Sequence, residues 1–248
     1  MDWLDAKHFL LELRLDREQV PAFDAYPFCL PAVRNLDVLP LHPKVTFIVG
    51  ENGSGKSTLL EALAVALGLN AEGGSRNFNF ATRASHSDLH QYLVPRKGVC
   101  RPKDCYFFRA ESYFNVATQV EQLGVGGAYG DRPLHEQSHG ESFLALVQNR
   151  FFGRGLYLLD EPEAALSPMR QIAFLTAMHD LAEEGSQFVV ATHSPIIMAY
   201  PHAWIYALGQ EGARRVPYKE TEHYKVSRDF LLRTDQMLSV LLSPRGAT

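Results

Sequence analysis

A glycine-rich loop that ends in a lysine and a serine carries the most specific chemistry in this chain. Residues 50–57 read Gly-Glu-Asn-Gly-Ser-Gly-Lys-Ser and match the pattern G-x-x-x-x-G-K-[ST]. Glycines let the backbone turn tightly and direct successive N–H groups toward one point, and the helix N-terminus behind them adds partial positive charge. We expect Lys56 to reach the β- and γ-phosphates of a nucleotide and the Ser57 hydroxyl to bind Mg²⁺.

The segments on either side of this loop fit a phosphate-binding unit. Residues 45–49 form an apolar, β-branched run that predicts a buried strand, and residues 58–67 are rich in helix formers. Gly68 then predicts the end of that helix. The order strand, loop, helix favours a phosphate site over a chance glycine turn before a buried helix.

An acidic pair follows a second apolar segment. Residues 156–159 read Leu-Tyr-Leu-Leu and predict a central parallel strand, which ends at Asp160 and Glu161. Asp160 is placed to hold the Mg²⁺ shell and Glu161 to polarise an attacking water. By itself the pair could equally be two surface acids, but together with Lys56 it predicts one phosphoryl-transfer site.

Two shorter motifs complete the set. Ser138 and Glu141 form S-x-x-E, which predicts a capping box before a helix over 143–152, and a capped helix N-terminus is also an anion site. His193 follows the apolar run 187–192, so it is expected at the carboxyl edge of a parallel sheet, facing the ligand crevice. Alone, the position would favour a histidine with satisfied hydrogen bonds at a strand end.

In this order the four elements resemble the ABC-type ATPases, from about residue 10 to about residue 208. The resemblance implies that Asp160 is the Walker B aspartate, that Glu161 is the catalytic glutamate and that His193 is the switch histidine that senses the γ-phosphate. It implies that the nucleotide-binding Walker A loop consists of Gly50, Glu51, Asn52, Gly53, Ser54, Gly55, Lys56, Ser57 and Thr58.

The resemblance also implies a signature motif and a dimer. Ser138, Gly140 and Glu141 match signature positions that contact the nucleotide, with His139 between them. In that family two nucleotide domains pair head to tail, and the signature of one closes over the ATP held by the other. We therefore expect ATP and Mg²⁺ as cofactors, an ATP-dependent homodimer, and Glu161, His193 and Lys56 as its catalytic residues.

Several positions depart from the family pattern. His139 stands where a glycine is usual, Glu141 where transporters often carry glutamine, and Ser167 where an aspartate follows the catalytic glutamate. The family's Q-loop glutamine has no clear match, and Glu111 and Gln91 remain alternatives for it.

The runs E-P-E at 161–163 and T-H-S at 192–194 resemble soluble RecF-like and OLD-like members more than transporter subunits. The stretch between Gly55 and Ser138 is too short for the long coiled coil of genome-maintenance members. We expect an ATP-hydrolysing dimerisation switch that acts on nucleic acid or a partner protein. The alternatives are the ATP-binding subunit of a membrane transporter and a regulatory module with little turnover, against which Glu161 argues.

Composition and periodicity bound the fold. The 248 residues are 46% hydrophobic and 21% charged with a net charge of −4, as in ordinary globular proteins. Alternating strands and helices predict an α/β fold with a largely parallel core sheet flanked by helices. For a P-loop NTPase of ABC type we expect a single domain over 1–248, with an antiparallel N-terminal β part, a helical signature lobe at about 84–150 and a C-terminal helix at about 225–243.

Other segments give coarser expectations. Strands are expected at 9–15, 106–110 and 203–208, and helices at 112–123, 168–184 and 226–242, with Ser167 capping the second of these helices. Three cysteines without paired spacing, a start without an export signal and the lack of a long apolar run predict a cytoplasmic protein with no membrane insertion of its own.

The segment 76–109 is locally basic, with seven basic and two acidic residues. Interleaved aromatic residues, among them Tyr106, Phe107 and Phe108, could stack on nucleic-acid bases. The alternative is a solvated basic face.

Overall fold

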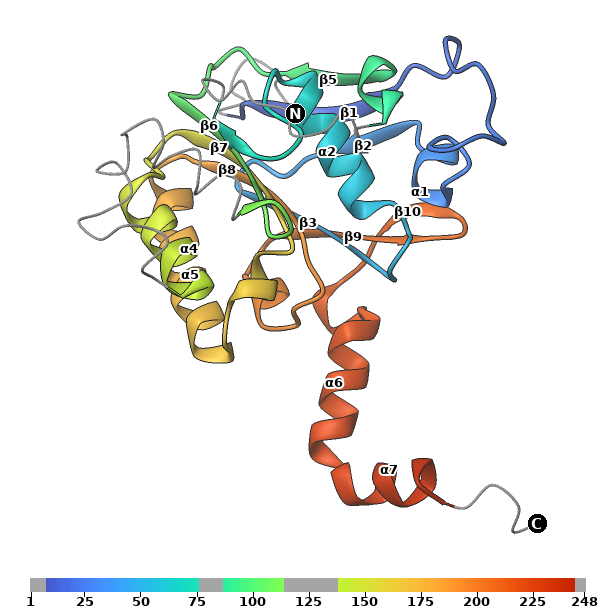
Figure 1. Ribbon diagram of the computed structural model, residues 1–248, viewed down its shortest axis with the longest axis vertical. Coiled ribbons are helices and arrows are strands. Elements are labelled where there is room, and N and C mark those ends of the chain that lie inside the picture. Colours follow the sequence, from blue (N-terminus) through green and yellow to red (C-terminus); the bar gives the residue numbers. More distant parts are fainter. Residues whose placement is uncertain (1–7, 76–86, 114–137, 244–248) are drawn as a thin grey trace.

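The computed structural model describes residues 8–75, 87–113 and 138–243 (Figure 1). In these ranges a seven-stranded sheet has the order β10-β9-β3-β8-β7-β6-β4, and a three-stranded sheet has the order β2-β1-β5. The larger sheet consists of β3 (Val45–Gly50), β4 (Gly74–Ser75), β6 (Asp104–Arg109), β7 (Gly155–Asp160), β8 (Gln187–Ala191), β9 (Trp204–Gly209) and β10 (Gly212–Arg215). The smaller sheet consists of β1 (Leu10–Leu15), β2 (Val38–Pro40) and β5 (Leu93–Lys97).

The centre of the larger sheet is parallel. β3, β6, β7, β8 and β9 all run in the same direction, whereas β4 and β10 pair antiparallel at its edges. Every residue of β7 and β8 is buried, which matches their continuous apolar sequences, because a central parallel strand is covered on both faces. Parallel strands bring their carboxyl ends to one edge, so Gly50, Asp160 and Ala191 end side by side at the edge where the predicted site residues follow.

Helices cover both faces of this sheet. α2 (Lys56–Ala66) lies on the face that also carries the smaller sheet, and α4 (His139–Asn149) and α5 (Pro168–Glu183) lie on the other (Figure 1). Two hydrophobic cores result, one containing Leu13 and Leu63 and the other Phe143, Phe174 and Phe47. The fold is therefore the α/β P-loop architecture with an antiparallel part that the sequence predicts.

Shorter elements connect these layers. They are the helix α1 (Pro31–Arg34) and the 3₁₀ turns η2 (Asp88–Gln91), η5 (Pro162–Ala165), η6 (Ile197–Ala199) and η7 (Tyr218–Glu220). Among the helices that the structure describes, none has both the length and the apolar character needed to cross a membrane.

The expected strands at 9–15, 45–49, 106–110, 156–160, 187–192 and 203–208 are all present, with ends shifted by one or two residues. The expected helix at 112–123, apart from its first residues, lies outside the described residues, as do Arg76, Phe78, Phe80 and Arg83 of the basic segment. Within 84–150, the described part contains β5 and β6 as well as α4.

Two expected helices differ in detail. The helix expected at 143–152 begins earlier, at His139, because Ser138 caps it. Ser167 does precede α5, but its side chain makes no capping hydrogen bond, so the predicted cap is wrong.

The C-terminal stretch at 226–242 is also not one helix. It forms α6 (Glu222–Leu232) and α7 (Thr234–Leu241), separated at Arg233, which has φ −133° and ψ 36°. Apolar residues of both helices, among them Leu231 and Leu241, are exposed, and both helices lead away from the sheets (Figure 1).

The expected stacking role of three aromatic residues in the basic segment is wrong. Tyr106, Phe107 and Phe108 are at most 1% exposed because β6 is an interior strand of the larger sheet. Their rings therefore belong to the two cores and face no ligand at the surface.

Gln187 joins the two sheets. Its side chain is buried, and its carbonyl oxygen accepts hydrogen bonds from the backbone N–H groups of Phe9 and Leu10, at 3.1 and 2.9 Å. Its amide nitrogen donates to the carbonyl oxygens of Leu10 and His42, at 2.8 and 3.0 Å. Both polar atoms of the Gln187 side chain are thus hydrogen-bonded, as burial of an amide requires. These bonds fix the start of β1 and the turn before β3 against the start of β8.

His42 fixes the turn that leads into β3. Its Nδ1 accepts hydrogen bonds from the backbone N–H groups of Lys44 and Val45, both at 3.1 Å, so this ring nitrogen must be unprotonated. Burial, with smaller contributions from His8 and Arg215, lowers the pKa of His42 from 6.5 to about 4.

We predict that His42 makes folding stability depend on pH. Because the folded pKa is below the unfolded value, its contribution is complete above pH 6.5 and is lost as the pH falls toward 4. His42→Asn keeps an acceptor at the Nδ1 position. The free energy of unfolding should then fall by about 1 kcal/mol less between pH 7 and pH 5 than it does in the parent protein, after allowance for solvent screening. Urea denaturation at both pH values measures this, with His179→Gln as control, since His179 is exposed on α5 and does not contribute to the pKa shift of His42. Equal pH dependence in His42→Asn and the parent protein would contradict the assignment.

Candidate functional site

The glycine loop has a backbone shape that side chains would prevent. Gly50, Gly53 and Gly55 have φ values of 155°, 79° and 96°, in the region that favours glycine. A Cβ atom at Gly50 would also lie 2.7 Å from the carbonyl oxygen of Leu208 on β9. The loop is therefore held close to the sheet edge, with its N–H groups available to an anion.

Lys56 is the first residue of α2, and its side chain lies under the loop. Its Nζ donates to the carbonyl oxygens of Gly50 and Glu51, at 2.9 and 3.0 Å. Burial lowers the pKa of Lys56, and the nearby carboxylates of Glu161 and Asp160 oppose that shift. A compact cation is thus held where the phosphates of a nucleotide would lie.

A second loop atom fits a phosphate. The Ser54 hydroxyl oxygen is buried and has no hydrogen-bond partner among the described residues. A buried hydroxyl without a partner is costly, so a bound anion at this loop would satisfy it. The residues present therefore fit the phosphate groups that the sequence motif predicts.

Ser57 and Asp160 meet from opposite sides of the site. The Ser57 hydroxyl donates to Asp160 Oδ1 at 3.0 Å, which joins the first turn of α2 to the end of β7. Burial raises the pKa of Asp160 to about 7, although the Ser57 hydrogen bond and Arg109 lower it. A hydroxyl and a buried carboxylate at hydrogen-bond distance fit the oxygen ligands that Mg²⁺ requires.

Arg109 is a site residue that the sequence did not single out. It ends β6, and its guanidinium contacts Glu61 of α2 at 2.5 Å and Glu111 at 3.3 Å, with Nε 3.8 Å from Asp160 Oδ2. Arg109 is the last residue of the basic segment 76–109, and the structure places it behind the acidic pair. Glu111, one candidate for the Q-loop position, has an exposed side chain and pairs with Arg109, and Gln91, the other, contacts Asp88.

Glu161 has a strained backbone. Its φ and ψ are both 51°, a left-handed conformation that costs a non-glycine residue about 1–3 kcal/mol. Its N–H donates to the Ala191 carbonyl oxygen at 2.9 Å, which ties it to the end of β8. Its Oε1 lies 3.7 Å from His193 Nε2, beyond hydrogen-bond distance. Strain of this kind is typical of functional positions.

Glu163 holds the histidine loop in place, and we call its two hydrogen bonds the Glu163 bridge. The carboxylate accepts from the Thr192 hydroxyl at 2.7 Å and from the His193 backbone N–H at 2.5 Å. The second glutamate of E-P-E and the threonine of T-H-S are the sequence signals that could have revealed this pair. The bridge fixes the position of the His193 backbone relative to Glu161.

The predicted signature residues lie at the start of α4. The capping box is confirmed: the Ser138 N–H donates to Glu141 Oε2 at 3.0 Å, and the Glu141 N–H donates to the Ser138 hydroxyl at 3.4 Å. Arg170 of α5 donates to both side chains, each at 3.0 Å. Gly140 packs so closely that a Cβ would lie 2.5 Å from the Ala165 carbonyl oxygen.

The structure brings together one group of predicted residues and leaves another apart. Lys56, Ser57, Asp160, Glu161 and His193 gather at the carboxyl edge of the parallel strands. In the described ranges, no hydrogen bond or ion pair joins the α4 residues Ser138, Gly140 and Glu141 to that group.

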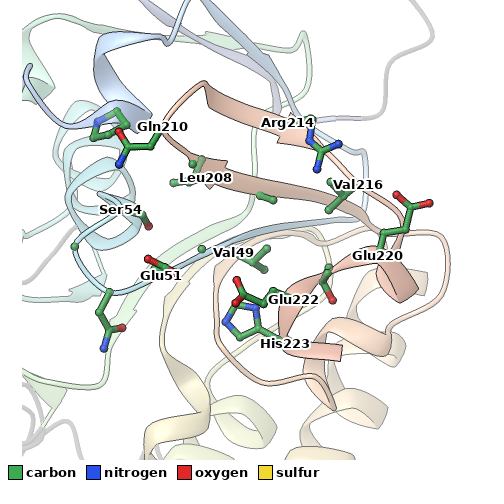
Figure 2. Close-up of a pocket in the computed structure, with 17 residues that line it drawn as sticks. Val49, Glu51, Ser54, Leu208, Gln210, Arg214, Val216, Glu220, Glu222 and His223 are labelled. Carbon is green, nitrogen blue, oxygen red and sulfur yellow. The ribbon is translucent and has the colours of Figure 1, made fainter. Parts of the chain in front are cut away.

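A cavity of about 500 Å³ adjoins the glycine loop. Besides the loop, its lining includes the ends of β9 and β10 and the first turn of α6 (Figure 2). Figure 2 shows Arg214 and Glu220 on its rim and His223 facing Val49 and Glu51. Arg214, Glu220 and His223 belong to no motif in the sequence, and only the fold brings them to the loop.

Family models and known proteins match this chain over the segments that form the site. Residues 27–121 match an AAA domain model, and residues 125–199 match a second AAA domain model whose description also names the AbiEii toxin of type IV toxin–antitoxin systems. The cytochrome c biogenesis ATP-binding export protein CcmA of Mesorhizobium japonicum is 30% identical over 60% of this chain and 78% of its own length.

Two further matches differ in how much of each protein is covered. The ABC transporter G family member STR2 of Medicago truncatula is 28% identical over 70% of this chain, but the match spans only 27% of STR2. The solved structure of cbiO1 from Clostridium perfringens aligns over 94% of this chain and 99% of its own, with 16% identity and a TM-score of 0.48.

The fold and the site define a P-loop nucleotide-hydrolase domain. The chain belongs to the ABC-type P-loop ATPases, as its relation to CcmA shows, and it is an ATP-binding ATPase. The resemblance inferred from the four sequence elements is thereby confirmed at the level of the family.

We predict that Glu163→Gln impairs turnover more than ATP binding. The amide nitrogen cannot accept a hydrogen bond, so either the Thr192 hydroxyl or the His193 N–H loses its partner, which costs about 1–3 kcal/mol of unfolding free energy. We expect kcat to fall by about 10-fold or more, because about 1.4 kcal/mol of lost positioning corresponds to a factor of ten. Steady-state kinetics and calorimetric ATP titration measure the two effects.

Glu211→Gln is the matched control, since Glu211 is exposed and far from the Glu163 bridge in sequence. Wild-type kcat in Glu163→Gln would show that the bridge does not position His193.

Proposed function

We propose that the protein is an ATP-driven dimerisation switch. The observation that supports this proposal is that the glycine loop and the capped N-terminus of α4 share no hydrogen bond or ion pair within the described part of one chain. Lys56, Ser57, Asp160 and Glu161 form one half of a phosphate site, and the capped N-terminus of α4 with Ser138 forms another. Two-fold pairing of two chains satisfies both halves at once, because an isologous interface uses each surface twice.

In this proposal each residue has a defined task. Lys56 Nζ binds the β- and γ-phosphate oxygens, and Glu161 takes up a proton from the attacking water at its carboxylate. His193 Nε2 donates to a γ-phosphate oxygen and so reports its presence. Mg²⁺, when bound between Ser57 and Asp160, supplies positive charge to the phosphates. Ser138 and the N–H groups at Gly140 act on the nucleotide of the other protomer.

The switch acts on nucleic acid or on a partner protein in this proposal, and the E-P-E and T-H-S runs support that branch. The exposed basic residues in the described part of the segment are Arg96, Lys97, Arg101 and Lys103. The cysteines Cys29, Cys100 and Cys105 are free thiols, which accords with a reducing compartment such as the cytoplasm.

A transporter subunit is the second candidate, supported by similarity to an ATP-binding export protein. Addition of DNA, RNA or a candidate membrane partner to an ATPase assay separates the two: nucleic-acid stimulation favours the first, and stimulation only by a membrane protein favours the second.

We predict that Lys56→Ala loses tight ATP binding. The lysine is the cation under the loop, and each charge-assisted contact that it makes contributes about 1.5–3 kcal/mol, so affinity should fall by about 100-fold. Isothermal titration calorimetry with MgATP measures this. Lys97→Ala, which removes an exposed lysine on β5, should bind as the parent does. Unchanged affinity in Lys56→Ala would refute the assignment of the loop.

We predict that Glu161→Gln binds ATP but does not hydrolyse it, since the isosteric amide cannot take up a proton. Bound ATP should then hold two chains together, and light scattering should show a dimer with MgATP and a monomer without it. A mass that stays monomeric at protein concentrations well above the ATP dissociation constant would sink the composite-site model.

Ser138→Arg tests the second half of that model in the Glu161→Gln background. It should spare ATP binding and prevent the dimer, because it places bulk and charge on the surface that meets the other chain. Gln148→Arg makes the same change of charge at the exposed far end of α4 and should still dimerise. Dimers of equal stability in both variants would show that the start of α4 is not at the interface.

A further inference from the structure

His223 contacts the switch histidine from a part of the chain that carries no ATPase motif. It is the second residue of α6, and its Nε2 lies 3.0 Å from Nδ1 of His193. The two ring centroids are 5.1 Å apart, with an angle of 57° between the planes. The contact therefore joins atoms edge to edge, as a hydrogen bond does.

Only one proton can occupy this contact. Burial lowers the pKa of His193, and Lys56 lowers it further, while burial and His193 lower the pKa of His223. Both rings are therefore neutral near pH 7, and each neutral imidazole has one donor and one acceptor nitrogen. Either His193 donates from Nδ1, or His223 donates from Nε2.

The other side of His193 decides between these arrangements. His193 Nε2 is buried, has no hydrogen-bond partner in the described ranges and faces Glu161 Oε1 at 3.7 Å. If Nδ1 carried the proton, the bare lone pair of Nε2 would face a carboxylate and, in the loaded site, a phosphate oxygen. If Nε2 carries the proton, both contacts are attractive. The second arrangement leaves Nδ1 bare, and His223 Nε2–H is then its donor.

We propose that His223 is a positioning residue that fixes the tautomer of His193, so that His193 points an Nε2–H at the γ-phosphate. The tautomer of a histidine is set by the hydrogen bond that its second nitrogen makes. The proposal rests on the proposed function only in giving His193 a phosphate to contact. The tautomer itself is a property of the protein without nucleotide.

The turn before α6 holds His223 against the histidine loop. The buried Thr221 hydroxyl accepts from the Tyr224 N–H at 3.3 Å and donates to the Tyr218 carbonyl oxygen at 2.7 Å. The Tyr218 hydroxyl donates to the carbonyl oxygen of Pro195 at 2.8 Å. The start of α6 and the segment that follows His193 are thus tied together independently of the two rings.

The position of His223 within α6 also favours a neutral ring that donates a hydrogen bond. His223 lies in the first turn of α6, where the partial positive charge of the helix N-terminus disfavours an imidazolium. In Figure 2 its ring faces the cavity beside the glycine loop, together with Glu222. His223 therefore connects the phosphate site to α6, which leads on to the exposed helix α7.

The test combines nuclear magnetic resonance with kinetics on the full chain. In protein with isotope-labelled histidine and no nucleotide, the ¹⁵N and ¹³C shifts of His193 should report the Nε2–H tautomer. His223→Ala should convert a substantial fraction to the Nδ1–H tautomer. His223→Gln should restore Nε2–H, because the bare Nδ1 selects the donor end of the amide.

Kinetics should follow the tautomer. His223→Ala should lower kcat on the order of 10-fold, as loss of a partner that orients a functional histidine does, with little change in ATP affinity. His223→Gln should recover most of that loss. Lys225→Ala, an exposed change two residues further along the same helix, should match the parent in both readouts.

Two results would overturn the proposal: an Nδ1–H tautomer of His193 in the parent protein, or unchanged His193 shifts in His223→Ala. Neither depends on hydrolysis or dimerisation. Failure of the proposed function would appear separately, as wild-type turnover in His193→Ala, and would leave the tautomer result standing.

Discussion

The geometry of the site depends on the carboxylate of Glu163. Glu163 reaches from the turn after β7 to the turn after β8, and it accepts hydrogen bonds from Thr192 and His193. β-sheet pairing aligns Asp160 with Ala191, but it ends there, and Glu161 and His193, to which we assign roles at the phosphate, come after the two strands. The Glu163 bridge extends the alignment of the two strands beyond the sheet, into the turns that carry these two residues.

The same bridge explains how a strained residue is tolerated. Glu161 adopts a left-handed conformation that would relax if the turn after β7 were free. Its N–H is held by the Ala191 carbonyl oxygen, and Glu163 holds the following turn from the other side. Both ends of the strained segment are thus fixed by β8 and its loop, so the cost is met by the surrounding structure and Glu161 is held facing the site.

The sequence predicted the parts of this site whose spacing is local. The glycine loop, the strand that ends at Asp160 and the capping box at Ser138 each lie within a few consecutive residues, and hydrophobic runs fix their elements. Both interpretations of the Ser138 motif are compatible, since the capping box is present and leaves the helix N-terminus at the surface. The C-terminal helices were foreseen only in part, because the break at Arg233 carries neither glycine nor proline.

The residues that the sequence missed share a different property. Arg109, Glu163 and His223 are defined by contacts with partners far along the chain, and no periodicity marks them. As part of a basic segment, Arg109 was expected at the surface. The parallel pairing of β6 with β7 instead places Arg109, at the end of β6, beside Asp160. The aromatic residues just before it were misassigned for the same reason, because burial of β6 follows from sheet order and not from its own composition.

The start of α4 shows how the proposed switch is restrained within one chain. Ser138 and Glu141 already bind each other, and Arg170 donates to both, so the hydroxyl expected to meet a phosphate is engaged within its own chain. A phosphate that arrives from a second chain would therefore exchange with existing contacts instead of filling an empty site. After that exchange the guanidinium of Arg170 would lie beside the incoming anion. The positive charge of Arg170 would also compensate for the nearby carboxylate of Glu141. In the proposed switch, dimer formation would then be favoured only when a nucleotide phosphate is present to take up the donors, as nucleotide dependence requires.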